Sequence, residues 1–192
     1  VHGGVRAGTF TGYGAALWCY THGDNHAAAF VFGASMFHLF NHAMAKGMLF
    51  MASGSVIHEV HHAHDHLHHG SDHGHHDFDP QDMRNMGGLA SKMPVTSTAM
   101  MIGSMSIIGI PLIGGFWSKE GIIAETWKAC LDEEPLMFGP AILVLLTAVM
   151  TGFYMSRMWL MTFAGEPRNE AVEHVHESTP WIKEPLIILT II

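Results

Sequence analysis

Charged residues are scarce in this chain of 192 residues. Only 14% of the residues are Asp, Glu, Lys or Arg, whereas 48% are hydrophobic. A soluble domain carries roughly a quarter charged residues, so a water-soluble chain of this length is not expected. The nine Lys and Arg residues are scattered and form no basic patch, which excludes a nucleic-acid binder. These observations favour a membrane protein.

Cysteine and the short motifs of cofactor chemistry are missing as well. Cys19 and Cys130 lie far apart without a CxxC partner, so we expect neither a disulfide framework nor a cysteine metal or redox site. No P-loop, GxGxxG or GxSxG motif is present. We therefore expect no cofactor and no redox centre in this chain. No signal peptide is found, and an apolar run is still rising where the sequence stops, so we expect a fragment of a longer chain.

The chain does contain long runs without a charged residue. Three of them approach or exceed the length that crosses a bilayer, and a fourth begins near the C-terminus. They predict membrane spans at about 27–57, 94–130 and 135–163, with the start of another at 180–192. Residues 3–20 are expected to form a partial span, because five glycines and an arginine interrupt them. The predicted fold is all-α: a polytopic transmembrane helix bundle in a single membrane domain.

The second span contains a helix-breaking sequence, GIPLIGG, at Gly109–Gly115. Pro111 removes a backbone hydrogen bond, and three glycines favour a departure from helical geometry. We therefore predict a broken helix, which at membrane depth must face protein or water. Lys119 and Glu120 follow directly. In a soluble protein such a dipeptide is usually an exposed pair at a helix end, but apolar runs flank this one.

Residues 58–93 form a polar stretch in which ten of the nineteen residues from His58 to His76 are histidine. We expect a cytoplasmic loop here, because this stretch and residues 164–183 carry Lys and Arg, whereas residues 131–134 carry only acids. Residues 131–134 are accordingly expected outside. Neutral imidazoles could bind zinc, nickel or copper weakly, but a solvated loop is the favoured interpretation, because the repeats fix no coordination geometry.

His58, Glu59 and His62 match the HExxH pattern of zinc proteases. In that pattern two histidines one helical turn apart bind zinc, and the glutamate is the general base. A stretch that is half histidine contains such pairs by chance, and no later acidic ligand lies in an apolar context. An intramembrane zinc protease therefore stays a remote alternative, with these three residues as weak metal candidates.

His38, His42 and Lys46 recur at intervals of four residues, which puts them on one helix face about 6 Å apart along the axis. A lysine near the middle of a span costs about 2.5–3.5 kcal/mol on insertion scales and is a functional candidate by default. Histidine exchanges protons near neutral pH. The three side chains together therefore indicate a route for protons.

Four segments and a later motif carry a resemblance. The segments are FHLFNHAMAKGMLFMASGSVIH (Phe37–His58), MRNMGGLASKMPVT (Met83–Thr96), GIPLIGGFWSKEGII (Gly109–Ile123) and FAGEPR (Phe163–Arg168), and the motif is HESxP (His176, Glu177, Ser178 and Pro180). In this order they resemble successive signatures of one family, the antiporter-like L subunit of respiratory complex I. Its relatives include the mitochondrial fifth subunit, the L subunit of archaeal F420H2 dehydrogenase and the Mrp cation/proton antiporters.

The resemblance implies a multi-pass protein of the cytoplasmic or inner membrane that carries protons through inverted repeats with broken helices. Redox chemistry in other subunits of an NADH- or F420H2-quinone oxidoreductase would drive it. Lys46 resembles the lysine of the central proton path, and His38 and His42 its histidine neighbours. Lys119 resembles the terminal lysine on the broken helix, with Glu120 as the acid that tunes it.

The implied partners are the other membrane subunits of the complex, including antiporter-like sister subunits, and the lipid bilayer. A stand-alone Mrp-type cation/proton antiporter shares the same motifs and is the alternative. The chain departs from the family pattern between the second histidine and the central lysine. The family usually has aromatic or apolar residues there, and this chain has Ala43, Met44 and Ala45. The histidine-rich stretch is also longer than is usual.

Overall fold

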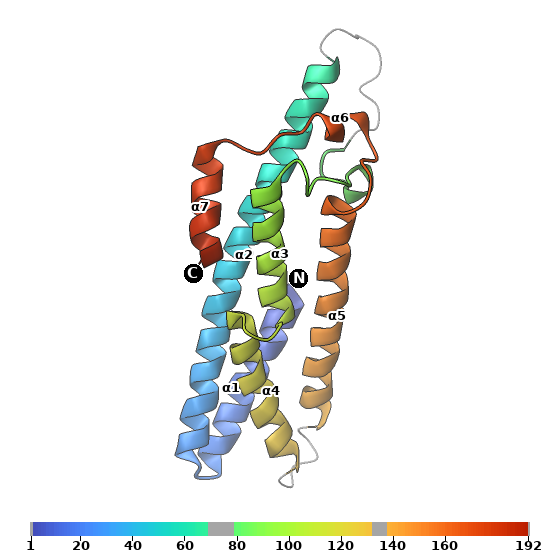
Figure 1. The fold of residues 1–192 in the computed structure, drawn as a ribbon. Helices are drawn as coiled ribbons and strands as arrows, with labels where there is room; N and C mark the ends of the chain where they lie inside the picture. Colours follow the sequence, from blue (N-terminus) through green and yellow to red (C-terminus); the bar gives the residue numbers. More distant parts are fainter. Residues whose placement is uncertain (1, 69–78, 132–137, 192) are drawn as a thin grey trace. The chain divides into compact units, whose positions relative to one another are not determined.

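The computed structural model describes residues 2–68, 79–131 and 138–191, and every regular element in these ranges is a helix. This confirms the all-α prediction. The elements, labelled in Figure 1, are α1 (His2–Thr21), α2 (Asn25–His68), η1 (Met83–Asn85), α3 (Pro94–Ile108), α4 (Gly114–Leu131), α5 (Phe138–Phe163), α6 (Glu170–Glu173) and α7 (Pro180–Ile191).

The chain folds as two compact units. The first contains Val1–Ala45 and Met105–Tyr154, and the second contains Lys46–Ser104 and Met155–Ile192. The long helices α2, α3 and α5 therefore contribute residues to both units.

In the first unit, small residues let the helices approach closely. Helix α1 packs against α4. A Cβ atom at Gly12 would lie only 2.0 Å from Oγ of Ser35 on α2 and 3.4 Å from the side chain of Ile122 on α4. Ala15, Ala16 and Val31 form a buried cluster beside this contact. Close packing of small side chains is what holds helices together where no water drives their association.

In the second unit, two of the sequence signatures meet. The backbone N–H of Gly88 donates to the carbonyl of Ala164 (3.2 Å), and that of Ala90 donates to Phe163 (3.1 Å). Gly87 has φ of 130°, and a Cβ there would lie 2.5 Å from the carbonyl oxygen of Glu166. Only glycine fits this close approach. The MGG and FAGEP segments are therefore one packed structure.

The HESxP motif also has a structural role in the second unit, at the start of α3. The carboxylate of Glu177 accepts a hydrogen bond from the backbone N–H of Val95 (2.8 Å) and one from the hydroxyl of Thr96 (2.6 Å). The first N–H groups of a helix have no partner within the helix, so Glu177 caps α3 from another segment. Buried hydroxyls of Ser55 and Ser178 hydrogen-bond to each other beside this cap.

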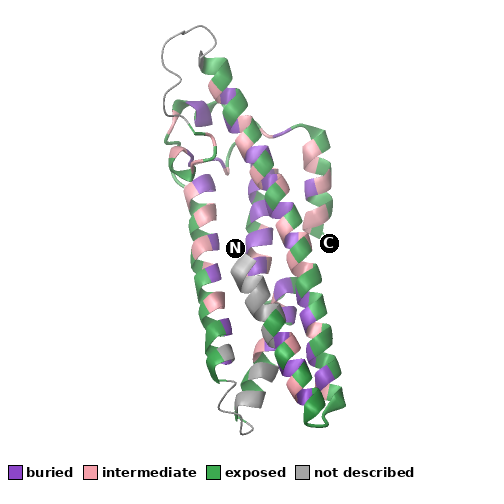
Figure 2. Cartoon of the chain, turned by 180° about the vertical axis from the view of Figure 1, so that it is seen from behind, coloured by how far each residue is buried: buried purple, intermediate pink, exposed green. Residues whose placement is uncertain are grey.

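Exposed residues occur along the whole length of the long helices (Figure 2). Many of them are large and apolar, whereas several hydroxyl side chains are buried. Large exposed apolar residues include Phe30, Phe32, Phe50, Leu143, Leu146, Val149, Phe153 and Leu160. A soluble chain rarely exposes so many large apolar side chains. Within the described residues, one helical segment is long and apolar enough to cross a bilayer: Ala141–Phe163, with 23 residues and a mean hydropathy of 1.6. Helix α3 is apolar but has only 15 residues.

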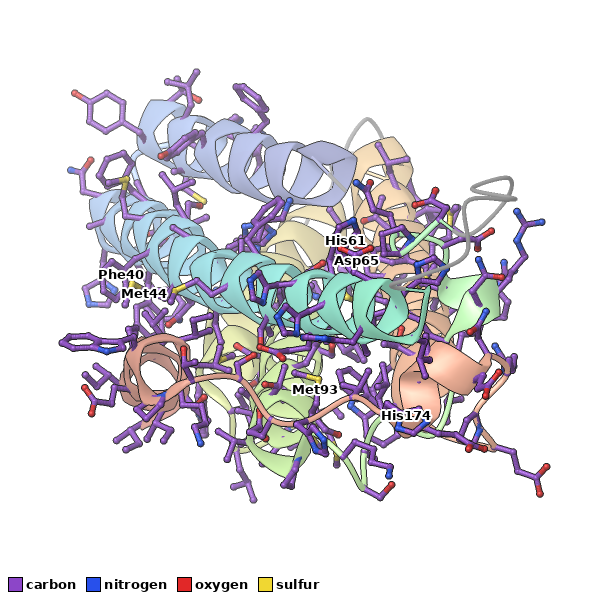
Figure 3. All side chains as sticks on the ribbon, turned by 90° about the horizontal axis from the view of Figure 1, so that it is seen from above. Phe40, Met44, His61, Asp65, Met93 and His174 are labelled. Atoms are coloured by element: carbon purple, nitrogen blue, oxygen red, sulfur yellow. The ribbon has the colours of Figure 1, made fainter. Side chains whose placement is uncertain are left out.

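Helix α2 continues beyond Ile57, so the first eleven residues of the histidine-rich stretch are helical rather than a loop. The reason lies in its inner face, where Val56, Val60 and Ala63 are buried at helical spacing. On the outer face, Nδ1 of His61 lies 3.2 Å from a carboxylate oxygen of Asp65 one turn later (Figure 3). The rest of that stretch up to residue 78 lies outside the described residues.

Candidate functional site

The predicted break in the second span is present. Helix α3 ends at Ile108 and α4 begins at Gly114. Gly109 has φ of 87°, the left-handed conformation that commonly ends a helix at glycine. The N–H groups of Gly109 and Ile110 both donate to the carbonyl of Met105, at 3.0 and 3.1 Å. The last carbonyls of α3 must therefore find donors elsewhere.

Lys119 supplies those donors. Its ammonium donates hydrogen bonds to the carbonyl oxygens of Ile107 and of Ile108, the latter at 3.1 Å. In a continuous helix, Ile107 would accept from residue 111, but Pro111 has no N–H. Leu112, with φ of 78°, has left the helical conformation. The half-buried Lys119 thus caps α3 at the end of the helix that carries negative partial charge.

Two glycines bring α4 into this position. A Cβ atom at Gly115 would lie 1.9 Å from the backbone oxygen of Ser106, so the first turn of α4 rests directly on the last turn of α3. A Cβ at Gly109 would lie 3.0 Å from Cδ of Lys119. Larger residues at either position would push the lysine away from its carbonyl partners.

Helix α2 is tied to the break by two polar contacts. Nδ1 of His38 lies 3.0 Å from Oγ of Ser118, the residue before Lys119, and both side chains are buried. One turn along α2, the side-chain amide of Asn41 donates to the carbonyl of Gly114 at 3.2 Å. The structure therefore brings His38 next to the residue that precedes Lys119.

A small cavity of about 10 Å³ lies between these elements. His38, Asn41, His42, Ala45, Ser106, Ile107 and Gly115 line it. Such a volume is at the lower limit for one water molecule. The rings of His38 and His42 have centroids 6.1 Å apart, as expected for one helical turn. Two imidazoles thus line the same cavity as Ile107. The carbonyl of Ile107 accepts a hydrogen bond from Lys119.

Two other predicted site residues, Lys46 and Glu120, do not line this cavity. Lys46 is half-buried on α2, one turn beyond His42, and is the first residue of the second unit. Glu120 is exposed on α4 and does not line the cavity. The exposed Phe40 and the half-buried Met44 lie one turn apart on α2 (Figure 3).

The HExxH residues have no zinc-site geometry in the part of the chain that the structure describes. His58 is exposed, and its Nδ1 lies 3.4 Å from the carboxylate of Glu59. The rings of His58 and His62 are 6.2 Å apart. In the described ranges, no three or more His, Cys, Asp or Glu residues are grouped so that they could hold a metal ion.

Two polar residues that contact the helix break, Ser118 and Asn41, are not among the site residues predicted from the sequence. Ser118 could have been found from its place between the break and Lys119 in the FWSKE segment. Asn41 lies three residues after His38 and so shares its side of a helix. Neither is ionisable, so a search for chargeable residues inside spans passes over both.

Comparison with known proteins gives a consistent assignment. Residues 26–151 match the family described as NADH:quinone oxidoreductase/Mrp antiporter, transmembrane. The NAD(P)H-quinone oxidoreductase chain 5 of Synechocystis sp. is 43% identical over 147 residues, which cover 74% of this chain and 18% of the relative. The chloroplastic NAD(P)H-quinone oxidoreductase subunit 5 of Chara vulgaris is 36% identical over 169 residues, with 82% and 23% covered.

A third relative agrees. The NADH-ubiquinone oxidoreductase chain 5 of Allomyces macrogynus is 33% identical over 159 residues, which cover 82% of this chain and 22% of the relative. The chain thus spans about a fifth of the length of these curated relatives. The family match extends over the stripe on α2, the break and Lys119. The chain therefore belongs to the NADH:quinone oxidoreductase/Mrp antiporter family of transmembrane proteins.

Proposed function

We propose that this chain is part of a proton-translocating membrane subunit of a respiratory NADH- or F420H2-quinone oxidoreductase. The observation that carries the proposal is the position of Lys119. Its ammonium donates to the carbonyls that the helix break leaves without backbone donors, beside a water-sized cavity lined by His38 and His42. The relatives named above are subunits of NAD(P)H- or NADH-quinone oxidoreductases, which supports the redox-driven class.

In this proposal, protons move by successive uptake and release at Lys119, His38, His42 and Lys46. One water molecule in the cavity would carry a proton between the imidazoles of His38 and His42, whose rings are too far apart for a direct hydrogen bond. An imidazole can accept a proton on one ring nitrogen and donate one from the other. Glu120 is exposed and adjacent to Lys119 in sequence, so it tunes the lysine through its charge rather than carrying the proton. Redox chemistry in other subunits supplies the energy.

The test compares Lys119 variants of the full-length subunit in the assembled complex. Lys119→Arg keeps a donor for the Ile107 and Ile108 carbonyls, but an arginine does not release its proton. Lys119→Ala removes both the hydrogen-bond donor and the exchangeable proton. Lys128→Ala is the matched control, because Lys128 is an exposed lysine on the same helix. Proton uptake into membrane vesicles and quinone reduction are measured together, and native gels report assembly.

We expect both Lys119 variants to lower proton uptake at least roughly twofold, with quinone reduction falling in parallel, while Lys128→Ala stays at the wild-type rate. Loss of a proton-transfer group costs about a hundredfold or more on its own path, but the sister subunits of the complex would keep pumping. Wild-type uptake in an assembled Lys119→Arg complex would exclude the proposed role. Uptake that persists without electron transfer and follows a sodium gradient would favour the Mrp-type antiporter.

A further inference from the structure

The hydroxyl of Ser118 has two partners in the first unit. It donates a hydrogen bond to the carbonyl oxygen of Gly115, at 3.1 Å, and it lies 3.0 Å from Nδ1 of His38. Ser118 is 0% exposed and His38 is 6% exposed. Neither contact is therefore open to bulk solvent.

The direction of the second bond depends on the tautomer of His38. A serine hydroxyl has one hydrogen to donate and lone pairs to accept. When that hydrogen goes to the Gly115 carbonyl, the oxygen can only accept, so Nδ1 of His38 carries the proton. In this neutral tautomer the other nitrogen, Nε2, has the free lone pair.

From this geometry we infer that Ser118 is the positioning residue of His38: it holds the ring in one orientation and one tautomer, with Nε2 as the nitrogen that takes up and releases protons. The inference rests on the proposed function, because it assigns a task to His38 on the proton path. Ser118 itself exchanges no proton in this scheme. It acts through His38, as hydrogen-bond partners of metal-bound or catalytic histidines do.

The surrounding backbone keeps Ser118 in place. Gly115, which accepts the hydroxyl hydrogen, rests on the backbone of Ser106 so closely that a Cβ would lie 1.9 Å from its oxygen. Asn41 holds the adjacent Gly114 carbonyl at 3.2 Å. The bond to His38 therefore depends on the helix break, and the same break supplies the carbonyls that Lys119 binds.

A double-mutant cycle in the full-length subunit of the assembled complex tests the inference. The variants are Ser118→Ala, His38→Ala, the double variant and Ser118→Thr, which retains the hydroxyl. Ser104→Ala is the matched control, because Ser104 is also buried but its hydroxyl has no hydrogen-bond partner among the described residues. Proton uptake into vesicles is measured per assembled complex, with native gels for assembly.

We expect Ser118→Ala to slow proton uptake roughly twofold or more. Ser104→Ala should leave uptake unchanged, and Ser118→Thr, which keeps the hydroxyl, should pump at close to the wild-type rate. The decisive outcome is non-additivity: in the His38→Ala background, Ser118→Ala should have no further effect, because residues that act through one group couple. An additive loss in the double variant overturns the inference. Wild-type uptake by Ser118→Ala, with His38→Ala and Lys119→Arg impaired, also overturns it but leaves the proposed function intact. Wild-type uptake by all of them overturns the proposed function.

Discussion

At the scale of single residues, the two lysines of the proposed path differ in their surroundings. Lys119 donates hydrogen bonds to two backbone carbonyls, so it has both a structural and a proposed chemical role. Lys46 is half-buried on an uninterrupted part of α2, where every carbonyl is already used by the helix. Its charge therefore has no capping role at a helix end, and its part in proton transfer is what the proposal above assigns to it.

Substitutions at Lys46 should separate charge from proton exchange. We expect Lys46→Arg and Lys46→Ala to assemble normally and both to pump protons at least roughly twofold more slowly, because arginine keeps the charge but holds its proton. Proton uptake into vesicles and native gels measure the two properties. His42→Ala should be milder, because a water molecule can bridge a gap of one turn. If assembled Lys46→Ala pumped at the wild-type rate, Lys46 would not lie on the path.

At the scale of helices, the break between α3 and α4 depends on contacts that tolerate no added atom. Gly115→Ala would put a methyl carbon 1.9 Å from the Ser106 oxygen, so α4 must move. Overpacking of this kind costs about 1–3 kcal/mol. We expect lower thermal stability of the assembled protein, together with slower proton uptake as Lys119 loses its carbonyl partners.

Gly33→Ala is the control for that prediction. Gly33 lies on α2 in the same unit, and an added Cβ meets no atom within 4 Å. Alanine favours a helix over glycine by roughly 0.5–1 kcal/mol, so thermal stability should stay the same or rise slightly. Equal melting temperatures for the two variants would mean that the close contact at Gly115 does not constrain the break.

The cap on α3 makes a separate prediction for the second unit. Glu177→Ala removes the acceptor for the Val95 N–H and leaves the buried Thr96 hydroxyl without its carboxylate partner. Loss of a helix cap costs about 0.5–2 kcal/mol. We expect faster hydrogen exchange in peptides that contain residues 94–98. Glu173→Ala, at an exposed position on α6, should leave exchange there unchanged; equal exchange in both variants would argue against the cap.

At the scale of the whole molecule, the distribution of loop charges predicts orientation. The apolar segment Ala141–Phe163 is long enough to cross the bilayer, so its two flanks should face opposite sides. Reporter fusions after Arg168 should read cytoplasmic, and fusions after Glu133 external, because the first flank carries Lys and Arg and the second only acids. Two reports from the same side would contradict this crossing. Glu133 itself lies outside the described residues.

The sequence by itself determined the helical fold, the position of the break and the stripe of His38, His42 and Lys46. These features are local. Apolar runs, a proline among glycines and a period of four residues predict them without contacts to distant segments. The sequence does not predict the extension of α2 to His68, because that extension depends on the burial of Val56, Val60 and Ala63 in the folded chain.

Only the tertiary structure decided which groups meet. The contact of His38 with Ser118 joins residues 80 positions apart, and the contact of Thr96 with Glu177 joins residues 81 positions apart. The hydrogen-bond partners of Lys119 are also known only from the tertiary structure. The sequence places Lys119 after the break, but it does not predict that the side chain turns back to the carbonyls of Ile107 and Ile108. The physical reason is that orphaned backbone groups and buried hydroxyls take whichever partner packing brings near. That partner is a property of the packed helices, not of any one segment.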